Sequence, residues 1–250
     1  MSDAVTPEEL LIGAVARLIL DPSAPPARHV AVGAASPIPA AACWLVRKSG
    51  HPIRLSLLHR RSGNPFTEGS RELFDLTGQG RIDLFFLGGG QIDGAANLNL
   101  IGTGDWPGDG VRFPGSFGSA FMYAMTPRTI LFREEHSPRV LVPRVDHVSA
   151  AAVTPGVFRR GTAQALVTGR CVFRFDPSRA RFALESAHPG ETADSIRANT
   201  GFDFDAPADV PVTPGPTDAE RALLRGPVCD EMLETYPEFC ARVWGRARAA

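Results

Sequence analysis

The sequence predicts an α/β fold in which helices cover a mainly parallel sheet. Segments with the spacing of strands and of helices alternate along most of the chain, a pattern typical of this fold class. The apolar run from Ile82 to Leu87 is typical of a buried strand, and it ends in three consecutive glycines, Gly88 to Gly90. A chain of 250 residues is long enough for one large domain of this kind. We therefore expect a single domain over residues 1–250.

Capping signals and apolar spacing predict the helices. Thr6 can cap a helix whose first position is proline and whose Glu9 closes a capping box, and apolar residues then recur at helical spacing as far as Ile19. A second capping box, Thr217 with Glu220, predicts a terminal helical stretch. The other predicted helices are residues 37–50, 70–77, 119–125 and 191–199.

Short apolar and β-branched runs bounded by glycine and proline predict the strands. A proline-rich connector, residues 207–216, precedes the terminal helices, and too little sequence follows it to build a second core. We therefore assign residues 207–250 to a connector and C-terminal helices packed on the same domain. The predicted strands are residues 29–34, 53–58, 82–87, 129–132, 140–142, 145–149, 164–168, 171–175 and 182–187.

Composition excludes several classes of function. The net charge is −1, so electrostatics give no reason to expect nucleic acid or an anionic membrane as the main partner. No apolar run approaches the roughly 20 residues of a membrane span, and residues 1–11 lack the basic and apolar regions of a signal peptide. We therefore expect a cytoplasmic protein. We also expect no metal site, because the four cysteines lack metal-ligand spacing; they are Cys43, Cys171, Cys229 and Cys240.

A candidate ligand site begins where the third predicted strand ends. Glycines let backbone N–H groups approach a ligand closely, and loops at the carboxyl ends of strands are where open α/β sheets bind ligands. Four polar residues follow that could orient a ligand, but two of them, Asp93 and Asn97, could equally bond their own backbone as turn residues. A second glycine-rich segment, residues 114–119, suggests a shared cleft. The residues predicted to bind substrate are Gly89, Gly90, Gln91, Asp93, Asn97, Asn99, Gly115, Ser116, Gly118 and Ser119.

Four motifs in order resemble the β subunit of class I coenzyme A transferases of the glutaconate CoA-transferase type. They are GGGQIDGAANLN (88–99), FPGSFGSA (113–120), HSPRVLVPRVDHVSA (136–150) and SAHPGETADSIRANTGFDF (186–204), and the resemblance extends from about Thr6 to Trp244. It implies a three-layer CoA-transferase-like fold, an acyl-CoA thioester as substrate, no cofactor, and an α subunit as partner in an αβ or α2β2 assembly. It also implies that the second glycine segment helps to form an oxyanion pocket, and Phe117 and Phe121 then suggest a more apolar acyl pocket here.

The resemblance departs from the family at the position of the nucleophile. In these transferases a β-subunit glutamate, which follows the second strand and precedes Ser-Gly or Asn-Gly, attacks the thioester. Here Arg61 precedes Ser62 and Gly63, and a guanidinium cannot be acylated in this way. The catalytic residue of this chain is therefore left unassigned.

The chain is also similar to the β subunit of heteromeric acyl-CoA hydrolases that open steroid-derived rings. Those proteins lack the β-subunit nucleophile and use an acidic residue of the α subunit. Three functions remain open: CoA transfer between an acyl-CoA and a carboxylic acid, hydrolysis powered by the α subunit, and a non-catalytic structural subunit. Glu68 and Glu72 are expected to be loop or first-turn carboxylates. His59 is expected to be a surface residue, with a role of His59 and Arg60 as acid or anion binder as the alternative. Residues 134–136 are expected at a solvated strand end, with His136 facing a thioester as the alternative.

Overall fold

The computed structural model describes residues 4–105 and 108–247, which cluster into two units. Among the described residues, unit 1 comprises 4–73, 81–86 and 214–247, and unit 2 comprises 74–80, 87–105 and 108–213. The outer bounds of the expected domain, residues 1 and 250, lie outside the described residues. The assignment of one domain stays a prediction.

Unit 1 contains three parallel strands and the helices that follow or precede them. Strand β1 (His29–Val32) lies between β2 (Arg54–Leu57) and β3 (Leu84–Leu87), with Val30 opposite Leu55 on one side and Leu84 on the other. All four residues of β1 are buried, as expected for a central parallel strand. The amino-terminal helix of the unit is α1 (Pro7–Ile19), followed by α2 (Pro37–Lys48) and by α3 (Ser70–Gly78), which continues into unit 2.

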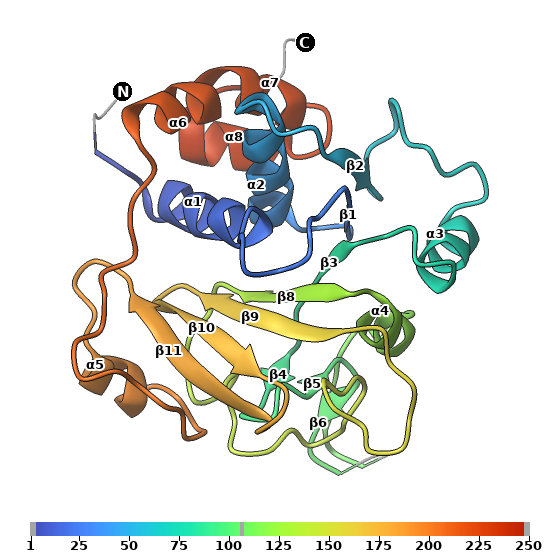
Figure 1. Cartoon of the computed structure of the whole chain (residues 1–250), viewed down its shortest axis with the longest axis vertical. Coiled ribbons are helices and arrows are strands. Elements are labelled where there is room, and N and C mark those ends of the chain that lie inside the picture. Colours follow the sequence, from blue (N-terminus) through green and yellow to red (C-terminus); the bar gives the residue numbers. More distant parts are fainter. Residues whose placement is uncertain (1–3, 106–107, 248–250) are drawn as a thin grey trace. The chain divides into compact units, whose positions relative to one another are not determined.

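The C-terminal segment completes unit 1. Helix α6 (Asp218–Leu223) continues through a π-helical turn, η1 (Leu224–Val228), into α7 (Cys229–Met232), and α8 (Pro237–Trp244) follows. These helices lie beside α1 and α2 within the unit (Figure 1). Pro227 lies inside η1, and a proline that removes a helical hydrogen bond is a known cause of such a local irregularity.

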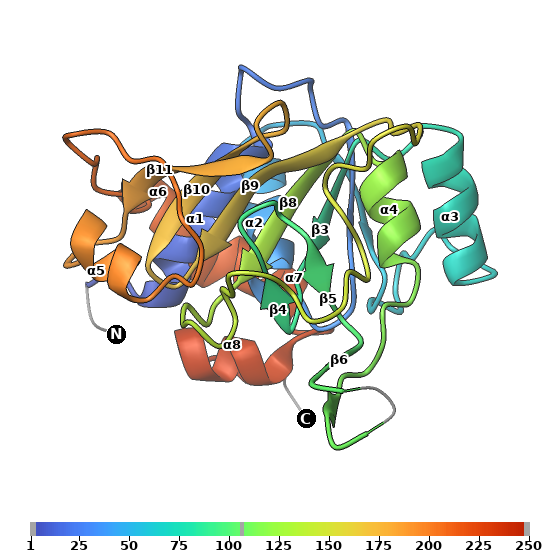
Figure 2. The ribbon, with the colours of Figure 1, turned by 90° about the horizontal axis from the view of Figure 1, so that it is seen from below.

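Unit 2 is built on four further strands. Strand β8 (Arg128–Arg133) pairs parallel with β9 (Thr162–Thr168), and β9, β10 (Cys171–Asp176) and β11 (Arg181–Ala187) pair antiparallel in order (Figure 2). Helices α4 (Ser119–Met125) and α5 (Ala193–Ala198) belong to this unit. Phe173 of β10 lies at the centre of its core, with ring centroids 4.9–6.2 Å from those of three other phenylalanines: Phe182, Phe202 and Phe204.

Most elements confirm the predicted segments to within a few residues. Both capping boxes are present, at Thr6 with Glu9 and at Thr217 with Glu220. The sequence missed two hairpins with strands of two residues each, β4 (Gln91–Ile92) with β5 (Leu98–Asn99) and β6 (Gly102–Thr103) with β7 (Val111–Arg112).

The predicted strands 140–142 and 145–149 were wrong. These residues form an irregular segment that meets the unit through two isolated bridges, Leu141 with Ile92 and Ala150 with Leu98. Val140, Leu141 and Val145 are buried, so their apolar character reflects packing rather than a ladder. Pro143 between them has no N–H to donate, and a proline interrupts a sheet ladder.

Candidate functional site

The first glycine segment leads from β3 into β4 without room for side chains. A Cβ on Gly89 would lie 2.7 Å from the carbonyl oxygen of Gln91, and a Cβ on Gly90 would lie 2.2 Å from the Phe113 ring. Contacts this short do not occur between real side chains and their neighbours. Both positions therefore favour glycine because of contacts within the protein, and the approach of a ligand to their backbone stays a prediction.

The two glycine segments adjoin within unit 2. The Phe113 ring covers Gly90, and the N–H of Phe113 donates to the carbonyl of Ile101 at 2.9 Å. The N–H of Gly115 donates to the carbonyl of Leu100 at 3.1 Å. The structure thus brings the residues predicted from positions 89–99 next to those predicted from positions 115–119.

Gln91 and Asn99 bond each other rather than facing solvent. Asn99 is fully buried, and its Nδ2 donates to Gln91 Oε1 at 2.7 Å and to the carbonyl of Gly102 at 2.6 Å. Gln91 Oε1 also accepts from the N–H of Asp146 at 3.0 Å, and its Nε2 donates to Asp146 Oδ1 at 3.3 Å. The two amides therefore fix the β4–β5 hairpin, and their role toward substrate stays a prediction.

Asp93 shapes the turn between β4 and β5. Its Oδ1 accepts from the N–H groups of Ala95 and Asn97, each at 3.0 Å. Its Oδ2 accepts from Asn97 Nδ2 at 3.1 Å and from the N–H of Val145 at 3.4 Å. The residue is 4 % exposed, and both carboxylate oxygens are engaged. Asp93 is therefore a turn residue of the kind that bonds its own backbone, and its carboxylate is not free for chemistry.

The second glycine segment has an unusual backbone and an exposed aromatic surface. Gly115 has φ +112° and Phe117 has φ +47°, a conformation that costs energy for a residue other than glycine. Phe117 is 73 % exposed, and its ring centroid lies 5.5 Å from that of Phe74. Phe121, also exposed, meets Phe74 at 5.9 Å. These phenylalanines give the segment an apolar face, in keeping with the more apolar pocket that the resemblance suggests.

Ser119 and Gly118 occupy the start of α4. A Cβ on Gly118 would overlap the Phe74 ring at 2.3 Å, so glycine lets the segment pass the ring. The Ser119 hydroxyl is buried and has no hydrogen-bond partner among the described residues, whereas its N–H donates to the carbonyl of Ser116 at 2.8 Å. A buried hydroxyl without a partner is costly unless a ligand or water completes it.

Arg61 lies in the loop after β2, where the resemblance places it. The loop is held by Glu234, which follows α7 and which sequence reasoning missed. Glu234 Oε1 accepts from the N–H groups of Arg61 at 3.2 Å and Ser62 at 2.8 Å, and the Ser62 hydroxyl also donates to this carboxylate. The bonds from Ser62 hold the pKa of Glu234 below its ordinary value. Since 173 residues separate Arg61 from Glu234, no local sequence signal could have identified the pair.

His136 is buried, which corrects the prediction of a solvated strand end. Its ring nitrogens lie 2.8 Å from the Thr168 hydroxyl and 3.0 Å from the Thr200 hydroxyl, and only 7 % of the residue is exposed. Burial, and then the charge of Arg170, lowers the pKa of His136 to about 4. The reason for the error is that the apolar neighbour Phe173, with a ring centroid 6.3 Å away, comes from β10 and not from the local sequence. Glu134 is exposed, as predicted, and Glu135 is partly buried in ion pairs with two arginines.

We expect this histidine to make unfolding sensitive to pH. The ordinary histidine pKa is 6.5 and the folded value is about 4, so the unfolded chain takes up the proton first. The contribution of neutral His136 is complete above pH 6.5 and is lost as the pH falls toward 4; between pH 7 and pH 5 it amounts to about 2 kcal/mol.

Urea unfolding of the wild type and of His136→Gln at pH 7 and pH 5 measures this contribution. The variant should lose less free energy of unfolding between the two pH values, while the exposed His59→Gln should behave as the wild type. An equal pH dependence in all three would contradict the assignment. Buried His29, whose pKa is also lowered by burial and by Arg54, leaves a residual dependence.

Comparison with known proteins identifies the family. A model of the family described as "Coenzyme A transferase" matches residues 51–199, which include the β2 loop and both glycine segments. The chain belongs to this family. Its match to the solved structure of glutaconate coenzyme A-transferase from Acidaminococcus fermentans has a TM-score of 0.76 at 20% identity and covers 92% of this chain and 97% of that chain. The fold is therefore the α/β, three-layer CoA-transferase-like fold that was expected.

Two curated relatives bear on the reaction. One is a subunit of the 3-oxoadipate CoA-transferase of Pseudomonas knackmussii, 29% identical over 153 residues, or 58% of each chain. The other is the cholesterol ring-cleaving hydrolase IpdB subunit of Rhodococcus jostii, 32% identical over 160 residues, or 62% of each chain. The present chain thus spans about three-fifths of the length of these two relatives.

Neither a metal centre nor a membrane helix occurs in the part of the chain that the structure describes. Residues 4–105 and 108–247 contain no group of three or more His, Cys, Asp or Glu side chains able to hold a metal ion. Among the helices in these ranges, none combines the length and the apolar character needed to cross a membrane. All four cysteines are free and buried, and burial raises the pKa of the Cys171 thiol to about 12.

Proposed function

We propose that this chain is the β subunit of a heteromeric coenzyme A transferase-family enzyme that acts on acyl-CoA thioesters. Its reaction would move CoA between an acyl-CoA and a carboxylic acid in the cytoplasm, with the thioester as substrate and no further cofactor. The observation that carries the proposal is that two glycine segments lie against each other inside the region that matches the family. An α subunit, in an αβ or α2β2 assembly, would complete the site.

The residues of the two segments would have different tasks. Gly89, Gly90, Gly115 and Gly118 would give the two turns the shape that faces the acyl group, because a side chain there would collide with the protein or strain the turn. The unpartnered Ser119 hydroxyl would contact the bound substrate together with Ser116. Gln91, Asp93, Asn97 and Asn99 would support these contacts by holding the hairpin in shape.

A second candidate is hydrolysis by a carboxylate that the α subunit supplies. Two observations favour it: Arg61 stands where the resemblance expects a nucleophilic glutamate, and the carboxylate of the first glycine segment, Asp93, is fully engaged by the protein. The similarity to a ring-cleaving hydrolase subunit agrees with this alternative. In that case this chain would shape the acyl pocket and its partner would carry the chemistry.

Reconstitution separates these functions. The chain is co-expressed with a family α subunit, and the purified complex is incubated with acyl-CoA and an isotopically labelled acceptor acid. Label in a new CoA thioester supports transfer, and free acid or a ring-opened product supports hydrolysis. If the α subunit has the same activity when this chain is omitted, both proposals fail and a structural role remains.

A trapping experiment tests the position of Arg61. Borohydride reduces a glutamyl-CoA thioester to an alcohol, so a nucleophilic glutamate of this chain would be marked during turnover. We expect intact-mass measurement to find no reduced residue on this chain, because a guanidinium forms no thioester. The Glu234→Gln variant provides the control, since Glu234 is the carboxylate bonded to the Arg61 loop. A mark that is present in the wild type and absent from this variant would contradict the expectation.

A further inference from the structure

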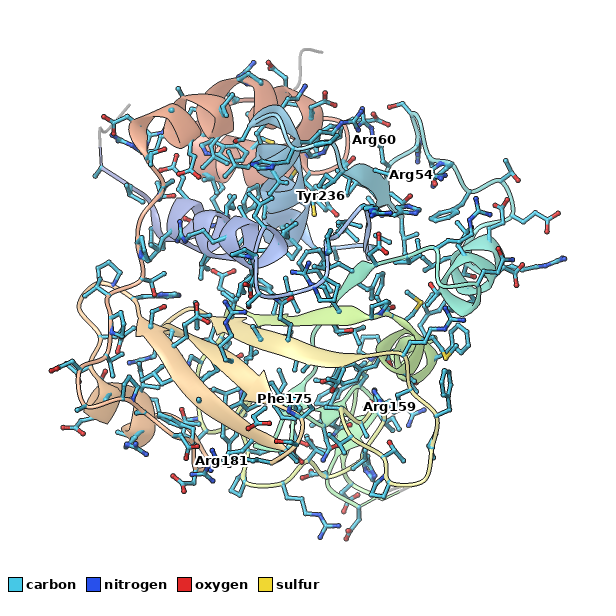
Figure 3. The ribbon with its side chains drawn as sticks, in the orientation of Figure 1. Arg54, Arg60, Arg159, Phe175, Arg181 and Tyr236 are labelled. Atoms are coloured by element: carbon cyan, nitrogen blue, oxygen red, sulfur yellow. The ribbon has the colours of Figure 1, made fainter. Side chains whose placement is uncertain are left out.

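Unit 1 contains a cavity of about 450 Å³ whose lining includes none of the residues of the two glycine segments. It lies where the end of α2 and the loop after β2 meet α7 and is of the size that small molecules occupy. Figure 3 labels Arg60, which enters this region from the loop after β2. The lining residues are Trp44, Arg47, Lys48, Leu55, Leu57, Arg60, Ser62, Gly63, Asn64 and Glu231.

Three cations of the lining surround one indole ring. The guanidinium carbons of Arg47 and Arg60 lie 5.4 and 5.1 Å from the ring centroid of Trp44, and the ammonium nitrogen of Lys48 lies 5.7 Å from it. Cation–π attraction holds these groups together against their mutual repulsion. The positive charge is therefore gathered around one ring at the side of the cavity.

The carboxylates near the cavity neutralise only part of this charge. Glu231 accepts from Lys48 at 2.8 Å and from Arg60 at 3.2 Å, and Glu234 lies 3.4 Å from Arg60. Burial alone would raise the pKa of Glu231, but the bonds and charges of Lys48 and Arg60 outweigh it and hold that pKa below its ordinary value. Arg47 is exposed and forms no ion pair within residues 4–105 and 108–247.

Three cations of the lining thus face two carboxylates, Glu231 in the lining and Glu234 beside it, which leaves an excess of one positive charge. A phosphate monoester carries about −1.5 to −2 charges near neutral pH and would be attracted by this excess. Guanidinium groups also bind phosphate through two parallel hydrogen bonds. Arg47, which has no carboxylate partner among the described residues, can offer this geometry without competition.

We propose that this cavity binds a small molecule that carries a phosphate group, with Arg47 and Arg60 as its principal ligands. The lining lies entirely among residues of unit 1. The bound phosphate would compete with Glu231 for Arg60. Arg60 and Ser62 flank Arg61, so the phosphate would bind beside the loop that Glu234 holds.

Calorimetric titration of the purified full chain tests the site. Inorganic phosphate and AMP serve as the two probes and distinguish the free ion from a nucleotide phosphate. We expect saturable binding of at least one probe, weakened about tenfold by Arg47→Gln, because one charge-assisted hydrogen bond is lost. Glu231→Gln should strengthen binding by about threefold, since it removes the competing carboxylate.

The matched control is Arg139→Gln, which removes an arginine whose side chain is 74% exposed and lies in unit 2. Circular dichroism establishes that each variant is folded. The opposite signs expected for Arg47→Gln and Glu231→Gln separate a binding site from general loss of structure. Absence of saturable binding for both probes, or equal affinity in Arg47→Gln and Arg139→Gln, would overturn the proposal.

Discussion

Replacement of Glu9 by alanine is expected to lower the free energy of unfolding by about 3–5 kcal/mol, the range for breaking a buried ion pair. Glu9 is fully buried, and its Oε1 and Oε2 accept from Arg225 at 2.7 and 2.9 Å. Its Oε2 also accepts from the N–H of Thr6 at 3.1 Å, so one carboxylate closes the capping box of α1 and joins α1 to η1. Alanine would leave a largely buried guanidinium without this partner.

Glu8→Ala provides the matched control for this loss. Glu8 is the preceding residue and pairs with Arg242, whose side chain is 58% exposed, so its removal should cost no more than about 1 kcal/mol. Urea unfolding of both variants at pH 7 gives the comparison, and equal losses would contradict the special role of Glu9.

The same pair should weaken in acid. Burial alone would raise the pKa of Glu9, but Arg225 and the Thr6 amide outweigh it and lower the pKa. The contribution of the carboxylate is therefore present above its ordinary pKa of 4.5 and is lost as the pH falls below that value.

Asp93→Ala is expected to cost about 3 kcal/mol of folding free energy, because a buried carboxylate that accepts several hydrogen bonds is removed. The carboxylate accepts four hydrogen bonds in and around the β4–β5 turn, and its removal leaves donors of Ala95, Asn97 and Val145 unpaired. A loss of activity in this variant would therefore reflect a change in the shape of the hairpin rather than the loss of a direct contact with substrate.

Asp93→Asn distinguishes these two causes. Its amide oxygen can still accept from the N–H groups of Ala95 and Asn97, so the variant should lose clearly less stability than Asp93→Ala in urea unfolding. Exposed Asp209→Ala is the control and should lie within about 0.5 kcal/mol of the wild type. If Asp93→Ala unfolds with the wild-type midpoint, the structural role assigned to this carboxylate is wrong.

Local signals in the sequence predicted most of the fold. The capping boxes at Thr6 and Thr217 and the apolar run before Gly88 depend on neighbours within a few residues, so their elements could be located. The structure of the segment from Val140 to Ser149 could not be predicted. Its apolar residues are buried against Ile92 and Leu98 as irregular backbone, and an apolar run in the sequence is the same whether it forms a strand or not.

The candidate site was predictable in part. The glycines followed from the loop pattern, and their joining through Phe113 and Leu100 agrees with the expected convergence. For Asp93, bonding its own turn was one of two open alternatives, and the structure shows these bonds. The bonds of Gln91 to Asp146 and Asn99 were not expected. Glu234 was beyond sequence reasoning, since it reaches Arg61 across 173 residues. The cations around Trp44 were not recognised as a cluster, although they lie near it in the sequence.

The makeup of unit 1 has a consequence for biosynthesis. Residues 4–73 and 214–247 both belong to it, while most of unit 2 is encoded between them. A ribosome therefore releases α1 and α2 long before η1 and α7 exist to cover them. During translation the apolar faces of these helices and the Glu9 carboxylate therefore lack their final neighbours. Unit 1 can complete its folding only after elongation has passed Arg225. Unit 2, in contrast, can mature while the chain is still being made.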